Sequence, residues 1–222
     1  MAAEQRAFEQ DPFATIPVGP LGIIPMRGCE ELARKVNYYL CTWRESRELS
    51  GDALYTFPGV EHDNFLLEAD CPRFGNGEGK GIIRESVRGY DLYLMTDVCN
   101  YSCTYKMYGM EVPMSPDDHF QDLKRIISAV ESKARRVSVI MPVLYSGRQH
   151  KRSSRESLDC ANALQELERM GVSNIITFDA HDPRVQNAVP LSSFDNVMPS
   201  YQMLKALFRE VKDIKVHKDS MM

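Results

Sequence analysis

Hydrophobic residues recur along this chain in two patterns that alternate, namely short continuous runs and longer stripes with helical spacing. The continuous runs predict buried strands at residues 90–98, 136–144 and 174–181. The segments between them predict amphipathic helices, because their apolar residues recur every three or four positions. Strands that alternate with helices indicate βαβ units, so we expect an α/β fold with a mostly parallel sheet.

Each predicted helix carries one apolar stripe. In the helix expected at residues 28–44 the stripe consists of Leu32, Val36, Tyr39, Leu40 and Trp43. The next helix has Phe120, Leu123, Ile126, Ile127 and Val130 on one face. The third presents Leu158, Leu164, Leu167 and Met170. The last bears Tyr201, Leu204, Leu207, Phe208 and Val211.

Three of these helices also carry local signals for their ends. Ser115 can act as N-cap, followed by a proline at the first helical position and by acidic residues in the first turn. Gly171 predicts the end of the third helix, because glycine readily takes the left-handed conformation found there. Ser200 is the predicted N-cap of the last helix.

Three segments lack a clear pattern or stop within one. Residues 1–20 are polar and contain proline, which predicts a loose arm. Residues 45–72 have no clear period, so we interpret them as a loop-rich insertion. The final residues, IKVHKDSMM, resemble the start of another strand, so we expect a second domain to be truncated there.

Composition restricts the class of protein. A chain of 222 residues suffices for one sizeable α/β domain, or for one domain and part of a second. Its net charge of −4 disfavours a general nucleic-acid binder. Because it has no signal-peptide pattern and no apolar run of membrane-spanning length, we expect a cytoplasmic protein. The six cysteines are then expected to be free thiols.

Candidate chemistry lies just after two of the predicted strands, where ligands bind in open α/β sheets. The loop at 145–157 carries Arg148, Gln149 and His150 in a strongly basic stretch, which suits a polyphosphate. A solvated basic loop without a ligand explains the same residues. Asp179, His181 and Asp182 follow the next strand, and this Asp-Ala-His-Asp segment could hold magnesium. A hydrogen-bonded structural histidine is the alternative there.

Familiar nucleotide-binding loops are missing. The chain has no Walker phosphate loop and no dinucleotide-binding glycine pattern at a strand–helix junction. The glycine-rich stretch FGNGE at 74–78 fits neither motif. Any nucleotide would therefore be held mainly by side chains.

Several segments, in order, resemble the ribose-phosphate pyrophosphokinase (phosphoribosyl pyrophosphate synthetase) family. FGNGE is similar to the family's Phe-x-Asp/Asn-Gly-Glu motif, and ESVRGYDLYL at 85–94 to its next conserved strand. The run at 128–152 resembles the helix, strand and arginine–glutamine ATP motif. GVSNIITFDAH at 171–181 resembles the strand that ends in Asp-Leu-His. The similarity covers roughly residues 22–212 and implies a three-layer, phosphoribosyltransferase-like fold.

The resemblance also implies an activity and roles for residues. The family transfers the diphosphoryl group of ATP to ribose 5-phosphate and releases AMP. By the motif match, Asn76 and Glu78 would contact the adenine side of ATP from a neighbouring subunit. Arg148, Gln149 and His150 would bind ATP, and His181, with Asp179 as a weaker candidate, would bind Mg²⁺. Two departures stand out: His150 replaces a family aspartate, and Asp-Ala-His replaces Asp-Leu-His.

Domain organisation and assembly follow from the same resemblance. It implies a pyrophosphokinase domain at 21–160 and the start of a phosphoribosyltransferase-like domain at 161–222. It implies dimers or hexamers, with no nucleic-acid or membrane partner. The family's later metal-binding aspartate, its catalytic loop and its ribose-phosphate loop have no match in these residues. We therefore expect no catalytic residue here and no product from this fragment alone. The alternatives are a silent relative that regulates full-length subunits and a general phosphoribosyl-binding module.

Overall fold

A computed structural model describes residues 17–49 and 64–211 of the chain. Most of the predicted N-terminal arm, the middle of the predicted insertion and the predicted final strand lie outside these residues. The described part contains one main sheet, two small two-stranded sheets and the helices that pack around them.

The main sheet has five strands in the order β1-β4-β7-β8-β9, and every neighbouring pair is parallel. Its strands are β1 (Leu21–Pro25), β4 (Asp91–Met95), β7 (Arg136–Ile140), β8 (Asn174–Phe178) and β9 (Ser193–Val197). The parallel α/β prediction is confirmed. The three predicted strands exist, but each ends three to four residues earlier than the apolar pattern did, because the chain turns at the sheet edge there.

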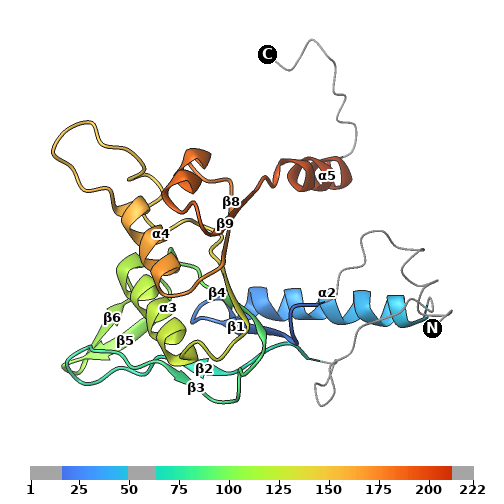
Figure 1. Ribbon diagram of the computed structural model, residues 1–222, viewed down its shortest axis with the longest axis horizontal. Helices are drawn as coiled ribbons and strands as arrows, with labels where there is room; N and C mark the ends of the chain where they lie inside the picture. Colours follow the sequence, from blue (N-terminus) through green and yellow to red (C-terminus); the bar gives the residue numbers. More distant parts are fainter. Residues whose placement is uncertain (1–16, 50–63, 212–222) are drawn as a thin grey trace, which may run out of the picture.

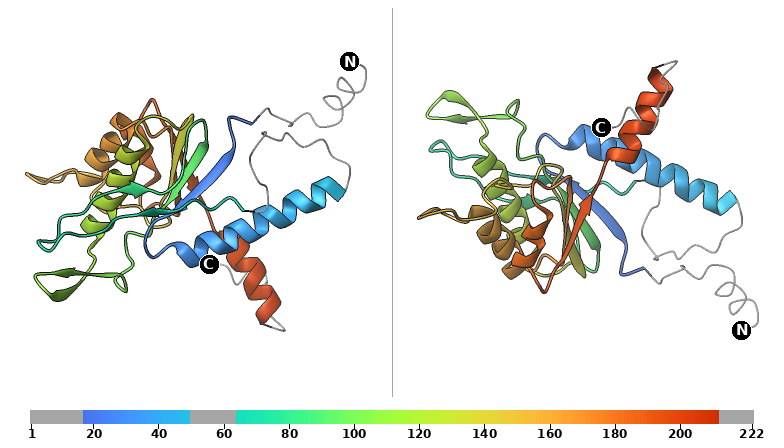
Figure 2. Two further views of the ribbon diagram at one scale, coloured as in Figure 1. Left: turned by 90° about the horizontal axis from the view of Figure 1, so that it is seen from below. Right: turned by 90° about the horizontal axis from the view of Figure 1, so that it is seen from above.

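Helices cover both faces of this sheet and make three layers (Figures 1 and 2). Helix α2 (Glu30–Leu49) lies on one face. Helices α3 (Pro116–Val130) and α4 (Asp159–Arg169) lie on the other.

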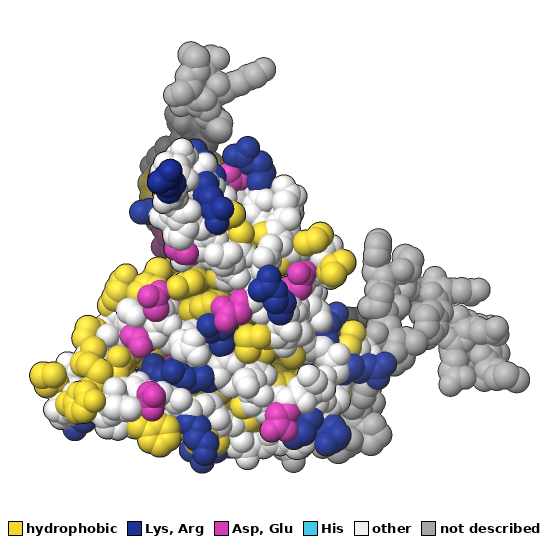
Figure 3. Space-filling model, turned by 60° about the vertical axis from the view of Figure 1, so that its left-hand side comes forward, with side chains coloured by type: hydrophobic (Ala, Val, Ile, Leu, Met, Phe, Trp, Pro, Cys, Tyr) yellow, Lys and Arg dark blue, Asp and Glu magenta, His cyan; other side chains and the backbone are white. Residues whose placement is uncertain are grey.

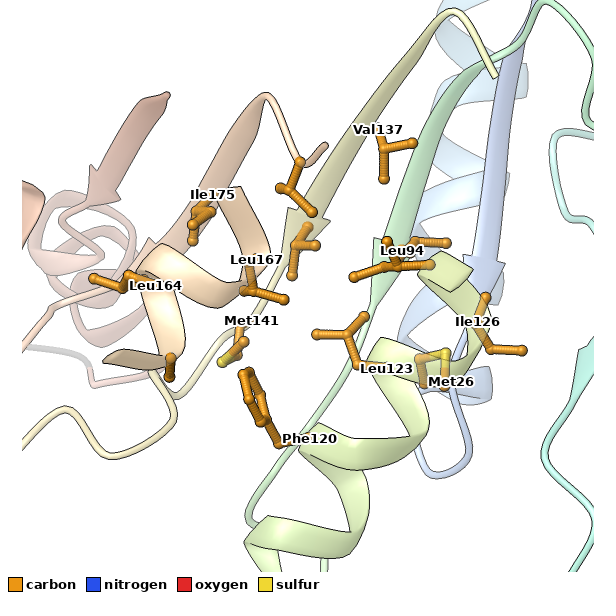
Figure 4. Packing of buried hydrophobic residues seen from close by; sticks show 14 of the residues in the cluster. Met26, Leu94, Phe120, Leu123, Ile126, Val137, Met141, Leu164, Leu167 and Ile175 are labelled. Atoms are coloured by element: carbon orange, nitrogen blue, oxygen red, sulfur yellow. The ribbon is translucent and has the colours of Figure 1, made fainter. Parts of the chain in front are cut away.

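The larger hydrophobic core lies between the sheet and the pair α3 and α4 (Figure 4). Leu123 and Ile126 of α3 and Leu164 of α4 are almost completely buried against strand residues such as Leu94. A smaller cluster under α2 includes Ala33 and Phe65. Full burial of one such aliphatic side chain contributes about 1.5–3 kcal/mol.

Local signals for α3 and α4 are confirmed. Ser115 caps α3 through a reciprocal capping box with Asp118, whose backbone N–H donates to the serine Oγ at 3.2 Å. Gly171 follows α4 with a φ of 91°, a backbone conformation that is unfavourable for residues with a Cβ. These ends depend on contacts within three or four residues.

The last helix, α5 (Ser200–Glu210), exists as predicted, but its predicted N-cap is wrong. Ser200 is its first helical residue, and Pro199 stands at the N-cap without a side-chain bond. None of its residues is buried, so its apolar stripe does not contribute to the core of the described chain. In Figure 1 it projects away from the sheet.

Helix α2 exists, and its inward face is only partly the predicted one, because Val36 and Leu40 pack inward but Leu32 is exposed. Tyr39 and Trp43 are exposed, whereas the packed face contains Ala33, Val36 and Leu40. The helix also extends to Leu49, so its last turn falls within the predicted insertion. Tyrosine and tryptophan tolerate exposure through their polar atoms, and small Ala33 lets the helix approach the sheet closely.

The far end of the predicted insertion is also part of the fold. Phe65 and Leu67 are buried, and their backbone groups bond to Ile23 of β1, with N···O distances of 2.8 Å in both directions. Residues 64–72 are mostly irregular, with only the two-residue strand Ala69–Asp70, yet they pack onto the sheet. Their irregular sequence pattern arises because only alternate side chains face the core.

Several elements carried no clear sequence signal. The small sheets pair β2 (Ala69–Asp70) with β3 (Ile82–Ile83) and β5 (Thr104–Met107) with β6 (Met110–Pro113). A 3₁₀ turn, η1 (Pro183–Ala188), precedes β9. Strands this short contain too few residues for a period of two to stand out.

Residues 161–197 join the same sheet and core as the residues before them. Leu164, Leu167 and Ile175 belong to one cluster with Leu94 and Leu123. The predicted boundary at 160/161 falls inside α4. The division into two domains stays a prediction.

All six cysteines are free thiols. Burial raises the pKa of Cys29 to about 12 and that of Cys160 to about 11, whereas Cys99 is exposed. Since the thiolate is the reactive form, we expect iodoacetamide at pH 8 to modify Cys99 well before Cys29 or Cys160. Mass spectrometry of native and unfolded samples checks this order. Equal labelling of all three in the native protein would contradict it.

Candidate functional site

The basic loop after β7 and the Asp-Ala-His-Asp segment after β8 meet at one edge of the sheet. The two strands are parallel neighbours, with Ile140 opposite Ile176, so their carboxyl ends point the same way. His150 lies with Nε2 3.4 Å from Oδ2 of Asp182. Its ring also packs edge-on against His181, with ring centroids 5.2 Å apart. The two predicted site segments therefore form one surface.

His150 is the most enclosed of the predicted site residues, with 11% of its side chain exposed. Its Nδ1 is buried and has no hydrogen-bond partner in the described structure. A buried polar atom without a partner is costly unless water or a ligand satisfies it. His150 thus offers one ring nitrogen to a ligand while the other faces Asp182.

Asp182 ends the Asp-Ala-His-Asp segment that was a candidate magnesium site, and in the structure it has a structural role. Its carboxylate accepts hydrogen bonds from Nε of Arg184 at 2.9 Å and from Nη2 at 2.6 Å. These bonds hold the pKa of Asp182 well below its ordinary value. Its Oδ1 also accepts the Arg184 backbone N–H and so caps η1. Arg184 therefore holds the Asp182 carboxylate beside His150.

Arg148 and Gln149 are exposed on the basic loop. Their side chains form no hydrogen bond or ion pair with any described residue, so both are available to a ligand. The backbone is held instead: the Gln149 N–H donates to the Ser146 carbonyl at 2.8 Å, and the Gln149 carbonyl accepts from Cys160 at 3.3 Å. Figure 3 shows Lys and Arg side chains on the upper part of the face where this loop lies.

Tyr145 anchors the start of the basic loop, a role that the sequence did not reveal. Its ring stacks on Phe120 with centroids 4.2 Å apart, and its hydroxyl donates to Oδ1 of Asp117 at 2.6 Å. Partial burial and this hydrogen bond raise the pKa of Tyr145 to about 12. The loop therefore leaves the sheet from a point fixed to α3.

Asp179 and His181 lie at the end of β8 with exposed side chains. Asp179 has a φ of 47°, and its N–H donates to the Val197 carbonyl at 3.1 Å. Across residues 17–49 and 64–211, no three metal-ligating side chains form a group. Mg²⁺ commonly uses one or two protein ligands with waters and substrate phosphates, so Asp179 fits it better than His181 does.

Asn76 and Glu78 lie elsewhere, on the turn between β2 and β3. Both are exposed, and the Asn76 side chain accepts the Glu78 N–H at 3.1 Å. No hydrogen bond or ion pair joins them to residues 145–157 within the described chain. The loop 74–78 instead lies beside the β5–β6 hairpin, whose Tyr108 N–H donates to the Gly75 carbonyl at 2.8 Å.

A buried ion network fastens the base of this loop to α3. Arg73 binds Asp122 through two bonds, Nη1–Oδ1 at 2.7 Å and Nη2–Oδ2 at 3.0 Å. Arg125 adds a third bond to the same carboxylate at 2.6 Å. The Arg73 guanidinium also lies over the ring of Tyr105, 4.8 Å from its centroid. Gly79 is required here, because a Cβ would overlap the Arg73 side chain.

A family model for the N-terminal domain of ribose phosphate pyrophosphokinase matches residues 21–171. The chain is 29% identical over 116 residues to ribose-phosphate pyrophosphokinase B of Dictyostelium discoideum, covering 51% of this chain and 31% of that protein. It is also 29% identical over 123 residues to the Bacillus caldolyticus enzyme, covering 54% and 35%. These alignments span about a third of each relative's length.

The fold also matches a solved structure. Phosphoribosylpyrophosphate synthetase from Mycobacterium smegmatis superposes with a TM-score of 0.66 at 19% identity, over 86% of this chain and 52% of that one. At this identity the match concerns the fold, and it confirms the expected three-layer class. Roles of individual residues do not follow from it.

Proposed function

This chain belongs to the ribose-phosphate pyrophosphokinase family, and on that premise we propose that it is the part of a ribose-phosphate diphosphokinase that binds ATP and Mg²⁺. The proposed site is the edge of the sheet where β7 and β8 end. Ribose 5-phosphate, the acceptor of the diphosphoryl group, would be held by residues outside this chain.

One observation carries the proposal: His150 of the basic loop contacts both His181 and Asp182 of the neighbouring strand end. A solvated basic loop would not need to pack its histidine against the next strand tip. The contact places free cationic and carboxylate side chains on one surface, which suits a metal-bound triphosphate.

In the proposed complex, the Arg148 guanidinium binds phosphate oxygens in a bidentate fork, and Gln149 donates its amide hydrogens nearby. His150 Nδ1, which lacks a partner, completes its hydrogen bonding with the ligand. Asp179 and His181 hold Mg²⁺, which would neutralise charge on the transferred group. The contribution of this chain is thus mainly positioning and charge stabilisation.

Asn76 and Glu78 lie apart from these residues, so we propose that they serve a neighbouring subunit. A shared site of this kind requires a homo-oligomer, such as the dimer or hexamer expected from the family. Among the described helices, none is long and apolar enough to cross a membrane. We keep a cytoplasmic location as part of the proposal.

The test is a calorimetric titration of the 222-residue chain with Mg-ATP, paired with an assay for AMP. We expect saturable ATP binding and no AMP release when ribose 5-phosphate is added, because no acceptor site is proposed within this chain. A titration with Mg-tripolyphosphate shows how much of the affinity comes from the phosphates. If the chain bound neither ligand, the proposal would fail; AMP release that depends on ribose 5-phosphate would refute the proposed inactivity.

One observation favours a second candidate, a non-catalytic relative that regulates full-length subunits. The His150 ring occupies the position of the family aspartate and is already engaged with Asp182, which removes a carboxylate from the site. Adding this chain to a full-length family enzyme would discriminate the two. A change in that enzyme's rate without ATP binding by this chain supports the regulatory role.

A further inference from the structure

The β5–β6 hairpin has no role in the function proposed so far. Its strands are joined by the two residues Tyr108 and Gly109, since Met107 pairs with Met110. Both turn residues have positive φ angles, 49° and 81°. Two successive positive φ angles in a two-residue hairpin turn define type I′ geometry, for which Asn-Gly is the favoured pair.

Tyrosine is a poor choice for the first position of such a turn. A bulky residue with positive φ is uncommon and costs stability unless its surroundings offset the strain. Burial does not offset it here, because 76% of Tyr108 is exposed to solvent. Where a residue breaks a local rule without a packing gain, a functional role is the usual reason.

The hairpin tip is joined to the loop 74–78. The Tyr108 N–H donates to the Gly75 carbonyl at 2.8 Å. Gly75 stands between Phe74 and Asn76 in the chain, so the backbone of Tyr108 lies against this part of the loop. Behind it, a Cβ on Gly77 would lie only 3.0 Å from Sδ of Met107. The loop and the hairpin tip are therefore one unit.

The surface of this unit combines aromatic and polar groups. Phe74 is 56% exposed and Tyr108 76% exposed, beside the exposed side chains of Asn76 and Glu78. Figure 3 shows hydrophobic side chains gathered at the lower left, the end from which the hairpin projects. Aromatic faces stack on nucleobases, and amide or carboxylate groups bond to base edges. This combination matches a purine base.

We propose that Tyr108 contacts the purine base of the nucleotide bound by the loop 74–78, and that it contributes to preference for a nucleoside triphosphate over a bare polyphosphate. The proposal rests on the function proposed above and adds a base-contacting residue to it. The turn holds the exposed Tyr108 side chain at the surface next to the loop that carries exposed Phe74, where a base can reach it.

The test replaces Tyr108 by residues that suit the turn better, in the full 222-residue chain. In Tyr108→Asn and Tyr108→Gly the thermal midpoint should stay the same or rise, because both residues tolerate positive φ. The dissociation constant for Mg-ATP should increase about tenfold, as expected for loss of one stacked base. The constant for Mg-tripolyphosphate should not change, because that ligand has no base.

Two matched variants complete the design. Tyr108→Phe keeps the aromatic face and should retain ATP affinity. Tyr101→Asn removes another tyrosine, 63% exposed in the loop before β5, and should leave ATP affinity unchanged.

Each outcome bears on one of the two proposals. Unchanged ATP affinity in Tyr108→Asn and Tyr108→Gly would overturn the role of Tyr108 and leave the proposed function standing. An equal loss for ATP and tripolyphosphate would overturn it too, because the effect would not concern the base. If the unaltered chain bound neither ligand, both proposals would fall. Selective loss of ATP affinity with retained stability supports the role of Tyr108.

Discussion

Asp122→Asn is expected to lower the free energy of unfolding by about 3–5 kcal/mol. Asp122 and Arg73 keep only 5% and 6% of their side chains exposed, and Arg125 bonds to the same carboxylate. Neutralising Asp122 removes the carboxylate to which both guanidinium groups bond, and Arg73 is left with the longer ion pair to Asp118, at 3.8 Å. The loss of a buried partner costs far more than the intact pair contributes.

Chemical denaturation monitored by circular dichroism measures this change. Asp70→Asn is the matched control, because Asp70 pairs with Arg84 at 2.7 Å while both side chains are more than half exposed. We expect the control to cost at most about 1 kcal/mol. Similar losses of unfolding free energy in the two variants would contradict the prediction that burial makes the Arg73–Asp122 pair more costly to break.

Arg148→Ala is expected to raise the dissociation constant for Mg-ATP about 30-fold. The Arg148 side chain is exposed and makes no bond to any other described residue, so its removal should not disturb folding. The lost interaction is a charge-assisted hydrogen bond to phosphate, worth about 2 kcal/mol. The loss should be equal for Mg-ATP and Mg-tripolyphosphate, since Arg148 is proposed to bind phosphate.

Arg155→Ala is the control for a diffuse charge effect. It removes the same charge from the same exposed loop at a position to which no ligand contact is assigned. We expect a change of less than about threefold, which salt should screen. If the two variants lost affinity equally, the loop would act only as a basic patch, and the specific role of Arg148 would be refuted.

Local patterns were sufficient for much of the fold. The capping box at Ser115 and the left-handed Gly171 depend on neighbours three or four residues away, so the sequence displays them directly. The strand runs at β4, β7 and β8 were visible because both faces of the sheet are covered and most side chains in them are apolar.

Prediction was weaker where an element has two possible apolar faces. In α2 the aromatic stripe with Tyr39 and Trp43 looked suited to the core, yet the smaller Ala33 faces the sheet. Hydrophobicity says nothing about how closely a helix packs on a sheet. Close packing favours small residues such as alanine at the contact. For α5 the stripe predicted a helix correctly but could not tell whether anything covers it.

The candidate site also has a part that the sequence predicted and a part that it did not. Parallel pairing predicts that the ends of β7 and β8 lie together, and the sequence therefore located Arg148 and His181 at one edge. The pairing of His150 with Asp182 and that of Arg73 with Asp122 join residues 32 and 49 positions apart. Such polar contacts have no periodic signal.

By itself the sequence determined the alternation of strands and helices, their capped ends and the strand tips that carry charge, because each depends on near neighbours or on a short repeat. Only the tertiary structure decided which charges are paired, which face of α2 is buried and that the β5–β6 hairpin adjoins the loop 74–78. Those features depend on contacts between segments that are far apart in the chain. Burial and geometry decide there which of several residues of the same chemical type become partners.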